Sequence, residues 1–216
     1  MKKNIILMGP PGAGKGTLAK QLKEALNLVH ISTGDMFRDA IKAGTELGLL
    51  AQSYINKGDL VPDDVTIGLV KERLSQDDCA NGFLLDGFPR TLPQAEALQK
   101  IAKEVSRNID VVVNLECDND ELIRRISGRR VCRNCGAPYH IISMKPKVEN
   151  VCDLCGGELY QRKDDNEEAL KVRLQHYNSE TKPLLDYYEG LGLLKSFNSL
   201  VGKEVLFDEV KAYLQK

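Results

Sequence analysis

The chain has 216 residues, of which 42% are hydrophobic and 28% charged, values typical of a globular protein with one sizeable core. Its 30 lysines and arginines nearly balance its 31 aspartates and glutamates, so the net charge of −1 gives no reason to expect a nucleic-acid or membrane partner. No segment is apolar over enough residues to span a bilayer, and the short apolar run Ile5–Met8 is no signal peptide. We therefore expect a cytoplasmic protein, whose thiols stay reduced.

Apolar runs that alternate with helical patterns predict an α/β fold. The run NIILM (Asn4–Met8) ends in glycine and proline, which is typical of a buried parallel strand. Leucines and alanines then recur at helical spacing, so a helix is expected to begin near Lys15. Strands that alternate with helices favour a parallel sheet covered on both faces. The predicted strands are Asn4–Met8, Leu28–Ile31, Phe83–Asp86, Val111–Leu115 and, more weakly, Leu193–Phe197.

Two segments interrupt this alternation. Residues 32–61 predict short helices with exposed polar faces and no strand. Residues 129–161 hold four cysteines among turn residues, without a helical period. We therefore predict one core domain with two inserts, the core consisting of residues 1–31, 62–128 and 162–216.

A long helix is predicted beyond the second insert. Asp165 is followed three residues later by Glu168, a spacing typical of a helix N-cap. Leu170, Leu174 and the residues that follow lie near one helical face. Pro183 is expected to bend this helix or to end its first half.

A glycine-rich loop follows the first strand. Its sequence GPPGAGKGT (Gly9–Thr17) nearly fits G-x-x-x-x-G-K-[ST], the pattern of loops that bind phosphate groups. The glycines allow backbone N–H groups to point inward, the next helix presents its positive end, and Lys15 adds a full charge. Gly16 displaces the hydroxyl residue to Thr17, so we expect phosphates and water to hold magnesium, with Asp86 in its outer shell.

Four of the six cysteines form two pairs, Cys132 with Cys135 and Cys152 with Cys155. Two C-x2-C pairs separated by 16 residues are typical of a zinc site. Four thiolates leave no open coordination position, so we predict a structural zinc ion rather than free thiols or disulfides. Iron could occupy the same sulfurs during expression. The remaining cysteines, Cys79 and Cys117, are interpreted as small buried hydrophobic residues.

The loop resembles that of the nucleoside monophosphate kinases, in which G-x-P-G-x-G-K-G-T is the usual form. STGDMFR, LLDGFPRT, GRRVC, RKDD and the four cysteines together resemble the adenylate kinases that carry a metal in a long lid. The resemblance covers nearly the whole chain. It implies a monomer that transfers a phosphoryl group reversibly from Mg-ATP to AMP, giving two ADP. It also implies a P-loop core, an AMP-binding insert (residues 32–61) and a zinc-binding lid (residues 129–161).

The resemblance also assigns roles to single residues. Lys15 and arginines would stabilise the moving phosphoryl group, since guanidinium groups suit phosphate oxygens; those implied are Arg90, Arg129, Arg162 and Arg173. For ATP it implies Gly12, Ala13, Gly14, Lys15, Gly16, Thr17, Arg125, Arg129, Pro138 and Tyr139. For AMP it implies Thr33, Arg38, Asp59, Leu60, Val61, Gly87, Phe88, Pro89, Arg90, Gln94, Arg162 and Arg173.

Several finer expectations accompany these assignments. The Gln94 amide can pair with the adenine edge through one donor and one acceptor. Arg125 and Arg129 are four residues apart and are expected on one face of a helix. Asp164 resembles a partner of the arginines. The segment NSLVGKEV (Asn198–Val205) does not align cleanly with the turn that borders the ATP base in the family, so no residue is assigned there.

Two other functions are kept as alternatives. A kinase for UMP or CMP would share most of the motifs, although Thr33, Gln94 and the long lid favour AMP. Zinc knuckles also occur in nucleic-acid-binding modules, which makes a nucleotide-gated protein of that class the other alternative. The segment APYHIISMKPKVEN (Ala137–Asn150) has few basic residues and argues against nucleic acid as a partner.

Overall fold

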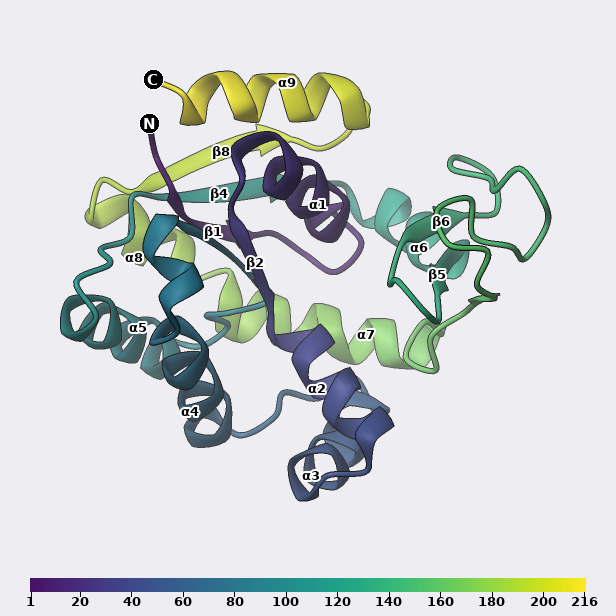
Figure 1. Cartoon of the computed structure of the whole chain (residues 1–216), viewed down its shortest axis with the longest axis horizontal. Coiled ribbons are helices and arrows are strands. Elements are labelled where there is room, and N and C mark those ends of the chain that lie inside the picture. Colours follow the sequence, from purple (N-terminus) through teal and green to yellow (C-terminus); the bar gives the residue numbers. More distant parts are fainter.

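A five-stranded parallel sheet forms the centre of the molecule (Figure 1). The computed structural model describes residues 1–216, and the strand order is β2-β3-β1-β4-β8. β1 is central, paired in parallel with β3 on one side and β4 on the other. All five strands predicted from the sequence are present, each within one residue of its expected bounds. They are β1 (Asn4–Met8), β2 (Val29–Ser32), β3 (Phe83–Asp86), β4 (Val111–Glu116) and β8 (Leu194–Asn198).

Helices cover both faces of the sheet because successive strand side chains point to opposite sides. In β1, Ile5 and Leu7 join a buried cluster with α1 and α9, whereas Ile6 and Met8 join one with α4, α5 and α8. None of the helices combines the length and the apolar character needed to cross a membrane. The core helices are α1 (Lys15–Leu26), α4 (Asp63–Leu74), α5 (Leu92–Glu104), α6 (Asn119–Ser127), α7 (Glu167–His176), α8 (Leu184–Gly190) and α9 (Lys203–Leu214), with a 3₁₀-helix at Asp77–Asn81.

Residues 32–61 form two helices, α2 (Thr33–Ala43) and α3 (Glu46–Ile55), and contain no strand beyond the last residue of β2. The helices project from the lower edge of the core in Figure 1. They pack on each other through Gly48, where a Cβ atom would lie 2.2 Å from the carbonyl oxygen of Ala40. Phe37, Ala51 and Val61 form the small apolar cluster of this insert.

The cysteine-rich segment forms a second, three-stranded antiparallel sheet in the order β6-β5-β7. It projects from the core on the right of Figure 1. Its apolar cluster has five residues, of which two are cysteines. The absence of a helix agrees with the sequence prediction. The strands are β5 (Arg129–Cys132), β6 (Pro138–His140) and β7 (Leu159–Tyr160).

The structure corrects the predicted start of the long helix. Asn166, not Asp165, is the N-cap of α7, and its side-chain oxygen accepts a hydrogen bond from the backbone N–H of Ala169 at 2.9 Å. The Asp165 carboxylate is buried and pairs instead with Arg129. A π-helical segment, Tyr177–Thr181, follows α7, and α8 begins directly after Pro183. This agrees with the prediction that Pro183 bends the long helix or ends its first half.

Candidate active site

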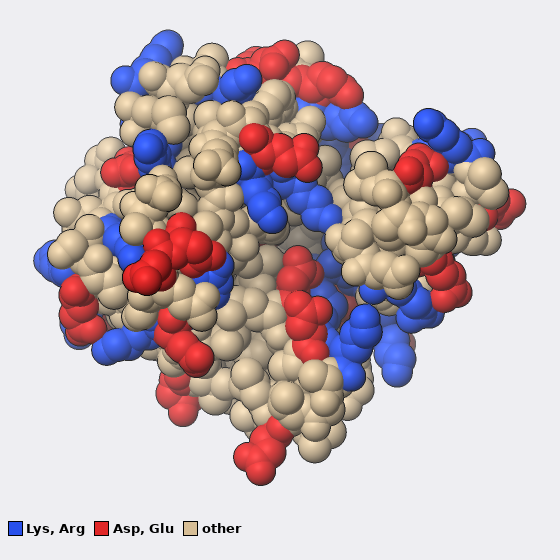
Figure 2. Space-filling view, viewed as in Figure 1, with Lys and Arg blue, Asp and Glu red and all other residues tan.

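A deep cleft opens where the carboxyl ends of β1 and β3 face the cysteine-rich lid. Its main cavity has a volume of about 570 Å³, and a smaller cavity of about 70 Å³ lies beside it under α2. Arg38, Arg90 and Arg173 line both cavities. In Figure 2 the surface is hollowed between the core and the lid, with blue and red side chains around the hollow. Ligand sites of α/β proteins lie at this edge of a sheet.

The glycine-rich loop forms one wall of the main cavity. Gly9, Gly12 and Gly14 have positive φ angles of 136°, 89° and 99°, and a Cβ at Gly9 would lie 2.6 Å from the carbonyl oxygen of Leu115. Only glycine fits there without a backbone shift. α1 then begins at Lys15 without a side-chain cap. The positive end of this helix is therefore free to meet an anion.

Lys15 lies inside this loop. Its ammonium donates hydrogen bonds to the carbonyl oxygens of Gly9 and Pro10, at 2.7 and 2.9 Å. Desolvation lowers the pKa of Lys15 to about 8, although the carboxylate of Asp86 partly opposes the shift. A bound phosphate would restore the charge that burial disfavours.

Asp86 ends β3 beside the loop. Its Oδ2 lies 3.7 Å from Nε2 of His30, which stands on the neighbouring strand β2. Burial raises the pKa of Asp86, but the nearby imidazole of His30 and the charge of Lys15 outweigh this effect and hold the pKa of the carboxyl below its usual range. Sequence reasoning missed His30. No local sequence signal indicates this contact, because it depends on the register in which His30 pairs with Leu84, two residues before Asp86 on β3.

Most of the predicted arginines carry protein carboxylates as partners. Arg173 Nη1 lies 3.1 Å from Asp164 Oδ2, and Arg129 Nε donates to Asp165 at 2.8 Å. Asp164 was expected as a partner, whereas Asp165 was not. Burial, together with the nearby charge of Arg129, lowers the pKa of Arg173 to about 10. These positive groups are crowded and partly desolvated, an arrangement that favours binding of a polyanion.

Arg162 and Arg38 share Asp35 in the same way. Arg38 Nη2 lies 2.6 Å and Arg162 Nη2 3.4 Å from Oδ1 of Asp35, on α2. Arg162 lies just after the lid sheet, so this carboxylate links the lid to the first insert. Burial lowers the pKa of Arg162 to about 10. Arg90 has no carboxylate within 4 Å and donates to the carbonyl oxygen of Gly87 at 2.9 Å.

The residues that the sequence assigned to ATP all line the main cavity. They do not share one helix, however: Arg125 is on α6, whereas Arg129 is on β5, so the expected common helical face is wrong. Gly128 ends α6, and a Cβ there would lie 2.3 Å from the ring of His140. The close approach of the His140 ring therefore requires glycine at the point where the chain passes from α6 to β5.

The C-terminal turn supplies residues that sequence reasoning missed. Ser199, Gly202 and Lys203 line the main cavity. Arg125 donates to the carbonyl oxygen of Ser199 at 2.9 Å and also pairs with Glu121 at 2.7 Å. These residues could have been found only by asking which segment follows the edge strand β8, because that segment must reach the same edge of the sheet.

Most residues assigned to AMP surround the smaller cavity. Thr33 donates from Oγ1 to the carbonyl oxygen of Gly87 at 3.0 Å, and Gln94 is 2% exposed. A Cβ at Gly58 would lie 2.5 Å from the carbonyl oxygen of Ala169, so α7 packs tightly where Asp59–Val61 pass the cavity. Three assigned residues lie elsewhere. Phe88 belongs to the apolar core, and Pro89 and Arg162 line the main cavity only.

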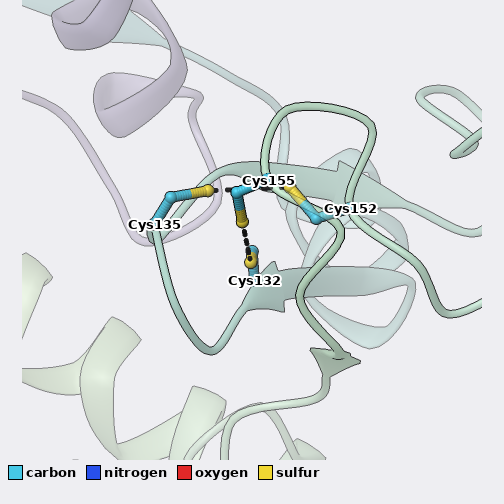
Figure 3. Close-up of side chains that lie close together, drawn as sticks. All are labelled: Cys132, Cys135, Cys152 and Cys155. Atoms are coloured by element: carbon cyan, nitrogen blue, oxygen red, sulfur yellow. Dashed lines mark hydrogen bonds between the residues drawn. The ribbon is translucent and has the colours of Figure 1, made fainter.

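The four paired cysteines meet in the lid (Figure 3). All four Sγ atoms lie within 4.8 Å of one another, with Cys132 and Cys155 at 3.4 Å and Cys135 and Cys152 at 3.6 Å. These distances are too long for disulfides. A tetrahedral zinc ion with Zn–S bonds of about 2.3 Å places its sulfurs about 3.8 Å apart. The donor set and spacing therefore fit such an ion. Of the two other cysteines, Cys79 is buried as predicted, whereas Cys117 is only half-buried, so the prediction that it is buried is wrong.

Comparison with known proteins agrees with this geometry. The family model for adenylate kinase matches residues 7–193. The chain is 55% identical over 211 residues to adenylate kinase from Geobacillus sp. strain WCH70, covering 98% of both chains. It is 60% identical over 195 residues to the enzyme from Bacillus cereus strain B4264, covering 90% of each. It is 55% identical over 212 residues to that from Carboxydothermus hydrogenoformans, covering 98% and 99%. The chain therefore belongs to the adenylate kinase family.

Proposed function

We propose that the main cavity binds Mg-ATP and the smaller cavity AMP, for the reaction of this family. The chain transfers a phosphoryl group reversibly between the two nucleotides, giving two ADP. An oxygen of the AMP phosphate forms a bond to the γ-phosphorus as the bond from that phosphorus to the β-phosphate breaks. The observation that carries this arrangement is the meeting of the two cavities at Arg38, Arg90 and Arg173.

Lys15 and the arginines stabilise the charge that gathers at this junction. No side chain needs to form a covalent bond, so catalysis rests on alignment and on fixed positive charge. Lys15 and the N-terminus of α1 bind the phosphates of ATP. Arg90, Arg129, Arg162 and Arg173 exchange their carboxylate or carbonyl partners for phosphate oxygens when the substrates bind. Closure of residues 32–61 and 129–161 over the core excludes water from the phosphates.

Asp86 fits the role of an outer-shell group for magnesium. It lies against the loop, since a Cβ at Gly16 would be 3.7 Å from its Oδ2, and its carboxyl is held ionised. Magnesium keeps most of its water in such sites, and these waters need acceptors. When bound with ATP, the ion would neutralise phosphate charge.

We propose that the cysteine cluster holds a structural zinc ion. Its four thiolates complete the coordination shell, so the ion takes no part in the reaction. Its role is to stabilise a lid whose own apolar cluster is small. We also infer that the protein acts as a monomer, because the residues that line the two cavities all come from one chain. A cytoplasmic location is inferred from its membership of the adenylate kinase family.

A coupled assay across nucleoside monophosphates tests this proposal. At subsaturating concentrations AMP is expected to be phosphorylated much faster than UMP or CMP. Gln94→Ala is expected to reduce discrimination for AMP, by about 1–3 kcal/mol on the scale of base-edge contacts, without weakening ATP binding. Equal rates with UMP and AMP would instead support a pyrimidine nucleotide kinase. A gel shift at low salt tests the nucleic-acid alternative, and none is expected.

A further inference from the structure

The amide of Gln94 is held by two hydrogen bonds from different parts of the chain. Gln94 lies in the first turn of α5, and its Oε1 accepts from the backbone N–H of Arg90 at 2.8 Å. Its Nε2 donates to Oδ1 of Asp63 at 2.7 Å. Asp63 is the first residue of α4 and precedes Gln94 by 31 positions. A contact from α4 thus reaches the side chain proposed to meet the base of AMP.

These two partners allow only one orientation of the amide. A carboxylate accepts hydrogen bonds and a backbone N–H donates them, so Nε2 must face Asp63 and Oε1 must face Arg90. A flipped amide would place two acceptors together at Asp63 and two donors together at Arg90. In the observed orientation one N–H and one lone pair of the amide remain for a ligand. Both remaining groups have fixed positions because the side chain is almost fully buried.

Asp63 is itself fixed by the start of α5. Its Oδ2 accepts a hydrogen bond from Oγ1 of Thr91 at 2.9 Å. Thr91 is the N-cap of α5, and its Oγ1 also accepts a hydrogen bond from the backbone N–H of Gln94. Asp63, Thr91 and Gln94 therefore form a closed ring of hydrogen bonds. Because of this ring, the position of the Asp63 carboxylate determines the position of the Gln94 amide.

We propose that Asp63 is a positioning residue that fixes the Gln94 amide so that the acceptor site selects a 6-amino purine over a 6-oxo purine. Adenine presents an exocyclic N–H donor beside a ring-nitrogen acceptor. A 6-oxo purine presents an oxygen acceptor beside a ring N–H donor. The fixed amide complements adenine, and a flipped amide would complement the 6-oxo purine. This inference rests on the proposed function, in which Gln94 meets the base of AMP.

The test compares kcat/KM for AMP with kcat/KM for inosine monophosphate, a 6-oxo purine nucleotide. Asp63→Ala removes the acceptor that fixes Nε2, and the AMP-to-IMP ratio is expected to fall about tenfold, as for one charge-assisted hydrogen bond. A merely structural defect lowers both values together and leaves the ratio unchanged. Asp64→Ala is the matched control, because it removes a carboxylate from the same first turn of α4 at an exposed position. Its ratio is expected to stay within twofold of the unsubstituted protein.

Gln94→Ala distinguishes the positioning role of Asp63 from the proposed contact between Gln94 and the base. If Gln94→Ala lowers the ratio and Asp63→Ala leaves it unchanged, the positioning role of Asp63 is wrong while the proposed base contact stands. If Gln94→Ala leaves the ratio unchanged, the base contact itself is wrong. A fall in the ratio for Asp64→Ala equal to that for Asp63→Ala would also overturn the inference, because loss of helix N-terminal charge would then explain both.

Discussion

The core and the lid of this molecule are stabilised in different ways. The central sheet separates two apolar clusters of 16 and 15 buried residues, whereas the cluster of the lid has five. Two of those five are metal-binding candidates, Cys132 and Cys152. Burial of apolar surface is the main stabilising contribution for a core, and a short segment cannot bury enough of it. We therefore expect the lid to depend on the proposed zinc ion, whereas the core is stabilised by its apolar clusters.

Polar contacts join these two regions. Arg129 pairs with Asp165, and Lys20 on α1 donates to the carbonyl oxygen of Gly136, at the turn after Cys135. The ring of His140 meets the carbonyl oxygen of Arg124 at 3.2 Å. Contacts of this kind exchange readily with water or with ligand, unlike interdigitated apolar side chains. A movement of the lid relative to the core would therefore break these polar contacts and leave both apolar clusters of the core intact.

The largest effect is expected from a change in the core site that leaves the lid intact. Lys15→Met removes the charge next to the transferring phosphates, and kcat should fall by about 100- to 1000-fold, the scale for loss of one preorganised group. Zinc content should be unchanged. The melting temperature should not decrease, because burial disfavours the Lys15 ammonium in the unliganded protein. Steady-state kinetics, metal analysis and calorimetry check the three parts. A loss of zinc in this variant would contradict the independence of the two regions.

The converse change acts on the lid. Cys152→Ser, or chelation of the metal, should release zinc and expose the lid amides to hydrogen exchange, while the strands of the central sheet stay protected. Each kcal/mol lost shifts the melting temperature by about 2–4 °C in a protein of this size, so a fall of several degrees is expected. Cys117→Ser is the control, since Cys117 is half-buried outside the lid. Purified protein without stoichiometric metal, and melting unchanged by a chelator, would refute the structural zinc ion.

The two arginines at the junction of core and lid should affect the transition state more than the ground state. Arg162→Ala and Arg173→Ala are expected to lower kcat by about 10- to 100-fold and to raise KM for AMP much less. The structure adds a reason: in the unliganded protein each already has a carboxylate partner, Asp35 or Asp164, so binding of substrate exchanges one anion for another. Kinetics of both variants decide this. A large rise in KM with kcat intact would mean that these arginines only hold substrate.

The sequence predicted the core far better than it predicted the contacts between regions. The strands and the glycine-rich loop were recognisable because apolar runs, glycines and helical spacing are local signals. Asp165 was misread because its local pattern matches an N-cap, whereas its buried carboxylate pairs with Arg129, 36 positions away. Asp63 was missed for the same reason, since nothing near it in the sequence indicates a partner on α5. Pairings between distant segments follow from the fold and leave no local pattern.

The smallest effect is expected in the pH dependence of ATP binding. It tests whether the core and the lid respond differently to pH. Lys15 has a pKa of about 8 in the unliganded fold, because burial outweighs the opposing charge of Asp86. Phosphates favour the charged amine, so ATP binding should take up a proton above pH 8. The dissociation constant for ATP should then rise with pH, at most tenfold per unit. Zinc binding by the lid should instead become tighter as pH rises, because thiolates bind zinc and acid releases it.

The lowered pKa of Lys15 affects ATP binding and stability in opposite directions: a rise in pH weakens binding but stabilises the fold. The folded-state pKa of Lys15 lies below its ordinary value of 10.5, so between about pH 8 and 10.5 the unfolded chain binds more protons at this residue than the folded one. The contribution of Lys15 to the free energy of unfolding should therefore increase as pH rises through this window. Calorimetry of ATP binding in two buffers of different ionisation enthalpy measures the proton uptake, and denaturant unfolding measures stability. Subtracting the profiles of Lys15→Met removes the titration of all other groups. If both pH slopes persist unchanged in that variant, a group other than Lys15 titrates, and the desolvated lysine does not control nucleotide binding.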